Sequence, residues 1–297
     1  MITDAGILTR LFKAGLNSLR PLTRLILAMK IIFKKIPFTL AVSISICFLM
    51  FSALAQTAAP KPANTDAKAE QIVARALSTL GGASYMNVKT VVGRGYFTPF
   101  KNGVSGDPIA FTDYIAYPDR ERTEFRSRVG RVIQTNTGAT GWLFDGAAKT
   151  LKSVTPDMVE DFRISIRTSV ENLLRGYWRS EGAQLSYVGR REAGVGRRNE
   201  TVKLTYPDGF TVEFEIGARD NLPAKAIYTK KNNEGEETIE EDRLAQYIKI
   251  GDITVPFVID HFSANQQTSR VNYEAVEFNR PLPDSLFARP ANVKAVR

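Results

Sequence analysis

Hydrophobic and polar residues alternate with a period of two over most of this chain, from Val88 onward. This alternation is typical of β-strands that have one buried and one solvated face. It is clearest over residues 211–216, where apolar side chains at even positions alternate with Thr211, Glu213 and Glu215. Turn signals separate the strands, so hairpin follows hairpin and the sheet should be antiparallel. The pattern predicts about twelve strands, over residues 88–97, 109–117, 120–126, 130–136, 141–145, 184–191, 200–206, 210–216, 223–230, 236–249, 254–263 and 268–278.

Two segments instead show the three-to-four spacing of amphipathic helices. The first spans residues 69–80, and Gly81-Gly82 provides a left-handed stop. The second is predicted over residues 156–178, with Thr155 as the cap, Pro156 at the first helical position and arginines on a separate side, where Glu171 can pair with them. We expect its apolar stripe to pack against the sheet; the stripe consists of Val159, Phe162, Ile166, Val170, Leu173 and Tyr177.

These elements predict an α+β fold, in which helices cover the concave side of one large, strongly curved antiparallel sheet. No change of composition marks an internal boundary, so residues 69–297 should form one domain. Residues 56–68 are rich in Ala, Pro, Thr and Lys and predict a flexible linker.

Residues 36–55 contain no charge, follow Lys30, Lys34 and Lys35, and end in Ala53-Leu54-Ala55. A basic region, an apolar run and a small-x-small exit predict a signal peptide over residues 29–55, cleaved before Gln56. An uncleaved membrane anchor is the alternative, because twenty apolar residues can span a bilayer. Residues 1–28, which precede the predicted signal peptide, are predicted to be an N-terminal extension without a folded role. The remaining chain is expected to be exported, either to the periplasm or the exterior.

The charge of the chain depends on this leader. The whole sequence has 40 Lys and Arg against 31 Asp and Glu, a net charge of +9. Residues 1–55 hold seven of the basic residues and one acidic residue, so 33 and 30 remain and the net charge falls to +3. A charge this small does not call for a nucleic-acid partner. Cys47, the only cysteine, lies in the apolar run, so the exported domain has neither thiol chemistry nor disulfides.

Several short motifs follow one another between residues 70 and 290: Ala76-Leu77 before Gly81-Gly82, Tyr117-Pro118-Asp119-Arg120-Glu121-Arg122, Gly141-Trp142-Leu143-Phe144-Asp145-Gly146, Ile253-Thr254-Val255-Pro256, and Pro283-Asp284-Ser285-Leu286-Phe287. In these motifs and their order the chain resembles the LolA-like lipoprotein-carrier superfamily. This superfamily includes outer-membrane lipoprotein-sorting proteins, mycobacterial lipid carriers and RseB-like sensors.

The resemblance implies an incomplete β-barrel with a helical lid, whose apolar hollow shelters acyl chains. A buried methylene contributes about 0.8 kcal/mol, so a chain of roughly sixteen carbons needs on the order of 10 kcal/mol of shelter to leave a membrane. In the family a strand arginine helps to hold the lid shut, and Arg122 or Arg120 matches that position. Side chains that could line the hollow or lid, or be ordinary core, are Tyr96, Trp142, Phe144, Phe162, Ile166, Val170, Trp178, Phe214, Tyr228 and Phe257.

Few residues of the sequence suit catalysis. His261 is the only histidine, so a two-histidine metal site is excluded, and we predict neither a metal nor another cofactor. Its position at a strand end predicts a residue at the rim of the sheet. An acidic run is predicted to be a solvated hairpin tip or a protected sheet edge, although a glycosidase needs only two carboxylates; it contains Glu234, Glu236, Glu237, Glu240, Glu241 and Asp242.

The hypothesis favoured by the sequence is therefore an exported, non-enzymatic carrier or binder of lipidated or acyl-bearing cargo in the cell envelope. Its expected partners are the acyl chains of a lipid or lipoprotein, and an envelope membrane protein that donates or accepts them. The alternatives are a stress sensor or scaffold that binds a protein through the same sheet, and a carboxylate-based glycoside hydrolase.

Overall fold

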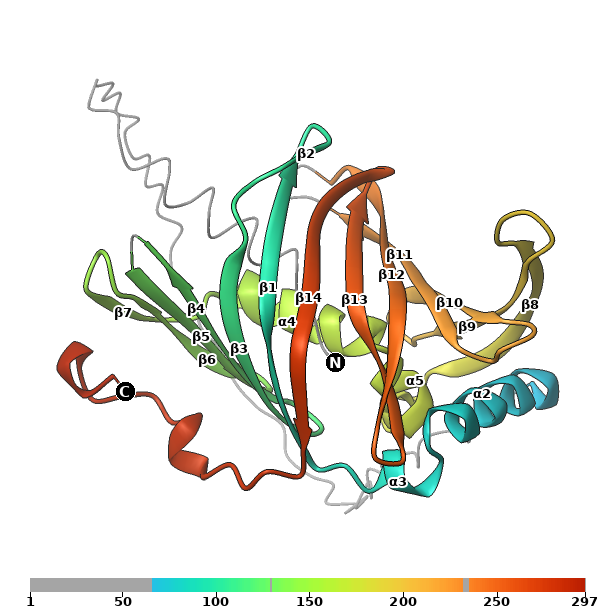
Figure 1. Ribbon diagram of the computed structural model, residues 1–297, viewed down its shortest axis with the longest axis horizontal. Coiled ribbons are helices and arrows are strands. Elements are labelled where there is room, and N and C mark those ends of the chain that lie inside the picture. The colour runs from blue at the N-terminus through green and yellow to red at the C-terminus, as the bar shows by residue number, and fades with distance from the viewer. Residues whose placement is uncertain (1–65, 129, 232–234, 297) are drawn as a thin grey trace, which may run out of the picture.

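The computed structural model describes residues 66–128, 130–231 and 235–296 (Figure 1). The predicted leader, the N-terminal extension and residues 56–65 of the predicted linker lie outside these ranges. Helix α2 begins at Ala67, inside the predicted linker, because the Asp66 carboxylate accepts the Lys68 N–H at 2.8 Å and caps the helix. Among the described helices, none combines the length and the apolar character needed to cross a membrane.

The sheet is antiparallel throughout, as predicted, and has fourteen strands rather than about twelve. Thirteen of them follow the order β7-β6-β5-β4-β3-β1-β14-β13-β12-β11-β10-β9-β8, and β2 pairs only with β1. The strands that the alternation missed, β2 and β7, are short and have no buried position. The strands are β1 Thr90–Lys101, β2 Val104–Ser105, β3 Ile109–Ala116, β4 Arg120–Ser127, β5 Gly130–Thr137, β6 Thr140–Asp145, β7 Thr150–Ser153, β8 Gln184–Glu192, β9 Arg198–Thr205, β10 Thr211–Gly217, β11 Pro223–Lys231, β12 Glu237–Ile250, β13 Ile253–Ser263 and β14 Gln266–Phe278.

The order of the strands divides the chain into two runs of hairpins. The first run starts at β1 and ends at the edge strand β7, and the second starts at the opposite edge strand β8 and returns to β14. Pairing of β14 with β1, from Val91 opposite Phe278 to Pro99 opposite Ser269, joins the two runs into one sheet. The sheet therefore has two edges, β7 and β8, that do not pair with each other.

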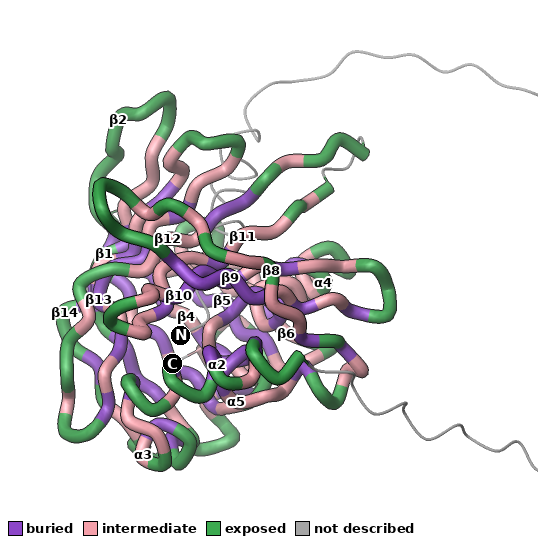
Figure 2. Tube along the Cα trace, turned by 90° about the vertical axis from the view of Figure 1, so that its right-hand side faces the viewer, coloured by how far each residue is buried: buried purple, intermediate pink, exposed green. Residues whose placement is uncertain are grey.

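Helices α2 and α3 precede β1 in sequence, whereas α4, α5 and η1 lie between the two runs, and α2, α4 and α5 lie on one side of the sheet (Figure 1). Ile72, Val73 and Leu80 of α2 and Leu173 and Leu174 of α5 share a hydrophobic core with one face of the strands. We call this side, which carries Val91, Phe111 and Phe125, the inner face, and the opposite side the outer face. Buried positions follow the strands that surround α2 and α5 (Figure 2). The helices are α2 Ala67–Leu80, α3 Ala83–Met86, α4 Pro156–Thr168, α5 Val170–Arg175, and the 3₁₀ turns η1 Tyr177–Arg179, η2 Asp284–Leu286 and η3 Val293–Ala295.

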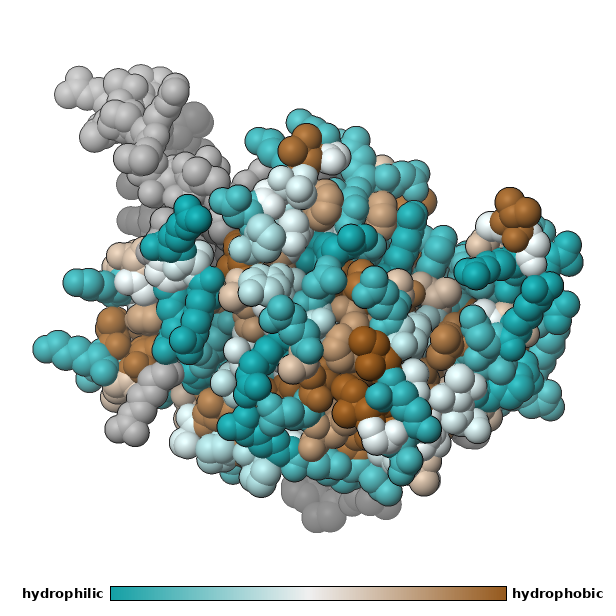
Figure 3. All heavy atoms as spheres, in the orientation of Figure 1, coloured by the Kyte–Doolittle hydropathy of each residue, from teal (hydrophilic) through white to brown (hydrophobic). Residues whose placement is uncertain are grey.

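The outer face is predominantly hydrophilic (Figure 3). On β9 to β12 it carries ion pairs between neighbouring strands, such as Lys225 with Glu241 at 2.7 Å. A hydrophobic patch interrupts this surface over the lower parts of β12 and β13 (Figure 3). The alternation in the sequence therefore matches one buried and one largely solvated face.

The single helix predicted over residues 156–178 is wrong, because the chain breaks at Ser169. That residue has extended backbone angles (φ −73°, ψ 146°) and separates α4 from α5. Its hydroxyl accepts the Asn172 N–H at 3.1 Å and so begins a new helix. Hydroxyl groups that bond to the nearby backbone compete with helix continuation in this way. Arg167 and Glu171, which the sequence pattern placed on a side of the helix separate from its apolar stripe, are both buried.

Replacement of Ser169 by Ala should lower the free energy of unfolding by about 1 kcal/mol, the usual effect of losing a helix cap. Urea unfolding measures the loss. Ser165→Ala is the matched control, because the Ser165 hydroxyl bonds to the Phe162 carbonyl within α4 and caps no helix. If both variants lose the same stability, the hydroxyl of Ser169 does not act as a cap.

Candidate binding face and the segments that cover it

Five aromatic side chains meet on the inner face, across β4, β3, β1, β14 and β13. We call Phe97, Phe111, Phe125, Phe257 and Tyr273 the aromatic cluster. Its ring centroids are 5.4 Å apart between Phe111 and Tyr273, 6.1 Å between Phe97 and Phe125, and 6.4 Å between Phe257 and Tyr273. These are the spacings of edge-to-face aromatic pairs. All five side chains are at most 8% exposed, so they form a continuous buried apolar surface.

Of this cluster the sequence identified only Phe257. Phe97, Phe111, Phe125 and Tyr273 were missed, although each lies in a predicted strand. Alternation was an available signal for Phe111, which shares a parity with Ile109 and Ile115, but not for Phe125, which is the only apolar residue of β4. That signal cannot show which strands are neighbours. The register places Phe111 opposite Phe125 on one side and opposite Gly95 on the other, and this pairing assembles the cluster.

Five of the ten predicted hollow or lid residues lie in or against the main inner core: Val170, Trp178, Phe214, Tyr228 and Phe257. Trp178 is fully buried, and its indole N–H donates to the Leu173 carbonyl at 3.2 Å. On α4, Phe162 is buried and Ile166 is half-buried. These positions place the predicted residues beneath or on the helices, and their part in ligand binding stays a prediction.

Helix α4 approaches β11 to β13 through polar side chains. Asp161 forms a 2.7 Å ion pair with Lys230 of β11. Ser165 and Thr168 line a cavity of about 30 Å³ between the helix and Ala226, Asp242 and Leu244, which is large enough to hold a water molecule. Helix α4 therefore combines the buried Phe162 of its predicted apolar stripe with these polar contacts.

Three predicted hollow residues lie on the wrong face. Tyr96 is 41% exposed, whereas its neighbour Phe97 is in the aromatic cluster. Trp142 and Phe144 are at positions of β6 that align with Thr135 and Ile133 of β5, and these positions point to the outer face. Successive side chains of a strand point to opposite faces, so a shift of one position decides the face.

Trp142 instead anchors the C-terminal segment, residues 279–296, on the outer face. Its indole N–H donates to the Phe287 carbonyl at 3.0 Å. Arg122 donates to the Leu286 carbonyl at 2.8 Å, and Arg120 forms a 2.6 Å ion pair with Asp284. The prediction that Arg120 or Arg122 latches the lid is therefore wrong: both side chains project from β4 on the face opposite Phe125 and the helices.

Arg122 also neutralises a buried carboxylate, since Glu124 lies 2.6 Å from its guanidinium and the two side chains are 6% and 8% exposed. Replacing Arg122 by Met should cost about 3–5 kcal/mol in the free energy of unfolding, because it leaves that charge buried without its main partner. Arg126→Met is the matched control. It touches the same carboxylate at 3.8 Å but is 69% exposed, so its loss should cost under about 1 kcal/mol. Equal losses in urea unfolding would contradict this assignment.

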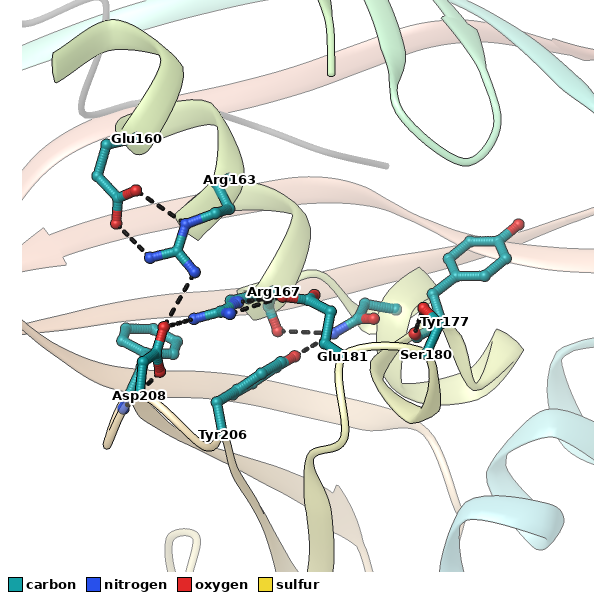
Figure 4. A network of polar contacts seen from close by, with 10 residues as sticks. Glu160, Arg163, Arg167, Tyr177, Ser180, Glu181, Tyr206 and Asp208 are labelled. Atoms are coloured by element: carbon teal, nitrogen blue, oxygen red, sulfur yellow. Dashed lines mark hydrogen bonds and ion pairs between the residues drawn. The ribbon is translucent and has the colours of Figure 1, made fainter. Parts of the chain in front are cut away.

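A network centred on Arg167 fixes α4 to the second run of strands (Figure 4). The Arg167 guanidinium is 2.6 Å from both Glu181 and Asp208, and it lies 4.1 Å from the centre of the Tyr206 ring. The Tyr206 hydroxyl accepts a 2.7 Å hydrogen bond from Asn172 of α5. Partial burial opposes ionisation of Asp208, but hydrogen bonds from Arg167, the Phe210 N–H and Arg163 outweigh it and lower its pKa to about 2. The contact is therefore an ionic one throughout the neutral range.

The prediction that His261 lies at the rim of the sheet is wrong. The residue is 6% exposed and lies on the inner face. Its Nδ1 lies 2.6 Å from Asp242 and its Nε2 lies 2.9 Å from Glu240. Burial opposes protonation, but the two carboxylates outweigh it and raise the pKa of His261 to about 10. The predicted solvated acidic run is accordingly wrong for Glu240 and Glu241, which are buried; Glu236 and Glu237 are exposed, and Glu234 lies outside the described residues.

As the only histidine, His261 gives a single set of imidazole signals in an NMR titration. We expect these signals to keep their protonated shifts from pH 6 to 8, with a midpoint far above the ordinary value of about 6.5. Because the folded pKa is raised, its stabilising contribution is complete below about pH 6.5 and declines as the pH rises toward about 10. A midpoint near 6.5 would contradict the buried, doubly paired arrangement and support the rim position.

Comparison with known proteins identifies this fold. No family model matches the sequence, and no curated protein sequence is similar to it. Among solved structures, a DUF1329 family protein from Desulfovibrio piger superposes with a TM-score of 0.53 and 11% identity, covering 74% of this chain and 96% of that chain. A LolA superfamily protein from Nitrosomonas europaea superposes with a TM-score of 0.51 and 14% identity, covering 72% and 97%.

The chain therefore has a LolA-like fold, which confirms the resemblance drawn from the sequence motifs. At sequence identities of 11% and 14%, these similarities concern the fold alone.

Proposed function

We propose that this protein is an exported, non-enzymatic carrier or binder of acyl-bearing cargo, lipid or lipoprotein, in the cell envelope. The observation that supports the proposal is the aromatic cluster on the inner face of a LolA-like sheet, on the side that the helices cover. A buried face of five aromatic rings offers an acyl chain a surface as apolar as the membrane that it leaves.

The arrangement of α4 suits a movable cover. Its described contacts with the sheet and the β9–β10 turn include the Asp161–Lys230 pair and the Arg167 network, which are polar. The break at Ser169 separates α4 from the well-buried α5, so α4 can shift without moving Leu173 or Leu174 from the core. In this proposal Arg167, on the helix itself, takes the latching role that the sequence assigned to Arg122 or Arg120.

Native mass spectrometry of the protein purified from its own envelope tests the proposal directly. A carrier should release acyl-bearing adducts on collisional activation. A stoichiometric protein partner without any lipid would instead support the sensor or scaffold. If neither lipid adducts nor a protein partner are detected, the carrier proposal has no support.

A substitution on α4 tests where the cargo lies. Ile166→Glu should abolish binding of a fluorescent fatty acid while the domain stays folded, because a carboxylate against an acyl chain costs several kcal/mol. Ile239→Glu is the matched control, since Ile239 is 61% exposed on β12 and should tolerate the charge. Thermal melts report folding in both variants. A folded Ile166→Glu protein that binds like the parent would refute the lid, and an unfolded one would assign Ile166 to the core.

A further inference from the structure

A pair of buried carboxyl groups lies beside the aromatic cluster on the inner face. Asp113 of β3 is 3% exposed and Glu121 of β4 is 4% exposed. Asp113 follows Phe111 by two positions on β3, and Thr123, opposite Asp113, precedes Phe125 by two positions on β4. The Thr123 hydroxyl donates to the Asp113 carboxyl at 2.8 Å, and Asp113 also shares a hydrogen bond with Glu121. Burial raises the pKa of Asp113 to about 7.

The hydroxyl of Tyr273 is directed toward this pair. Tyr273 lies beside Gly93, where an added Cβ would be only 2.5 Å from its ring atom Cε1. Gly93 is the partner of Asp113 in the β1–β3 register, so the ring extends across the glycine toward the carboxyl. Burial, Asp113 and Glu121 together raise the pKa of the Tyr273 hydroxyl, as expected for neighbouring acids.

This hydroxyl is buried and has no hydrogen-bond partner among residues 66–128, 130–231 and 235–296. A buried polar group without a partner lowers stability by about 1–3 kcal/mol, so a ligand that supplies one is favoured there. The unpartnered hydroxyl therefore points to a ligand at this place independently of the acidic pair.

Two amide side chains extend the polar surface onto β5. Gln134 is opposite Thr123, and Asn136 is opposite Glu121; they are 7% and 5% exposed. We call Asp113, Glu121, Thr123, Gln134, Asn136 and the Tyr273 hydroxyl the polar end of the inner face. The polar end adjoins the aromatic cluster directly. The inner face therefore has an apolar part, the aromatic cluster, next to a part that is rich in hydrogen-bond acceptors.

We propose that the polar end binds the head group of the cargo and selects a head group that donates hydrogen bonds and carries no negative charge, such as an ammonium or a hydroxyl. The inference rests on the proposed function, because the aromatic cluster must hold the acyl chain. Carboxyl groups accept donors and repel an anion, and burial strengthens both effects. A carboxylate or phosphate head would therefore be rejected at the place where an amine is bound.

Three amphiphiles with the same twelve-carbon chain test the selection: dodecylamine, dodecanol and laurate. Isothermal titration calorimetry at pH 8, below the aggregation concentration of each, gives the dissociation constants. We expect dodecylamine to bind at least about tenfold more tightly than laurate, the ratio for one hydrogen bond to a charged group. Dodecanol should lie between them.

The preference should depend on the polar end. Asp113→Asn combined with Glu121→Gln keeps the side-chain shapes and should bring the ratio between dodecylamine and laurate close to one. Glu277→Gln is the matched control, because Glu277 is a half-exposed outer-face carboxylate paired with Arg94 at 3.0 Å, and the ratio should not change.

Tyr273→Phe separates ligand binding from structure. Removing an unpartnered hydroxyl should leave the free energy of unfolding unchanged or raised, while the affinity for dodecylamine and dodecanol falls several-fold. The head-group selection is overturned if the affinity of this variant is unchanged, or if the parent protein binds laurate as tightly as dodecylamine. Either result leaves the proposed carrier function unaffected. If none of the three amphiphiles binds, the proposed function fails together with this inference.

Discussion

Pairing of β1 with β14 is the contact on which the rest of the structure depends. The chain makes two runs of hairpins that are far apart in sequence, and this antiparallel ladder joins them into one sheet. The aromatic cluster lies across the joint, since Phe111 and Phe125 come from the first run and Phe257 and Tyr273 from the second. The polar end has the same origin: Asp113 precedes the joint and Tyr273 follows it. Without the ladder, neither surface exists.

Burial of charge on both faces is the second constraint. Arg122, Arg167 and His261 are each about 5% exposed, and each contacts at least one carboxylate at less than 3 Å. Removing a charge from water is costly and is offset only by close partners of opposite charge. The same side chains hold neighbouring segments: Arg122 donates to the Leu286 carbonyl of the C-terminal segment on the outer face, and Arg167 ties α4 to Glu181 and Asp208 on the side of the inner face. A purely apolar contact would be less selective, because it is not directional.

The two faces of the sheet thus differ in the side chains that they carry and in the segments that cover them. The outer face is held by ion pairs between strands and by the C-terminal segment. The inner face combines aromatic rings, a buried carboxyl pair and a helix attached by polar groups. A sheet of this kind can offer an amphiphile an apolar surface for its chain and acceptors for its head, because successive strands place unlike side chains side by side.

The sequence by itself determined the antiparallel sheet, the first helix and the LolA-like fold. Alternation with a period of two is a local property, and Val212, Phe214 and Ile216 show it whatever their neighbours are. The same pattern did not reveal the break at Ser169, where a hydroxyl that caps the next helix competes with helix continuation.

Tertiary structure decided the site. Trp142 and Phe144 belong to the outer face and Phe125 to the inner face because of register, and register depends on pairing between strands rather than on composition. His261 lies inside because β12 brings Asp242 and Glu240 to both of its ring nitrogens. Tyr273 reaches toward Asp113 because Gly93, about 180 positions earlier in the chain, leaves room for its ring. Such contacts between distant segments are not recorded in any local pattern of residues.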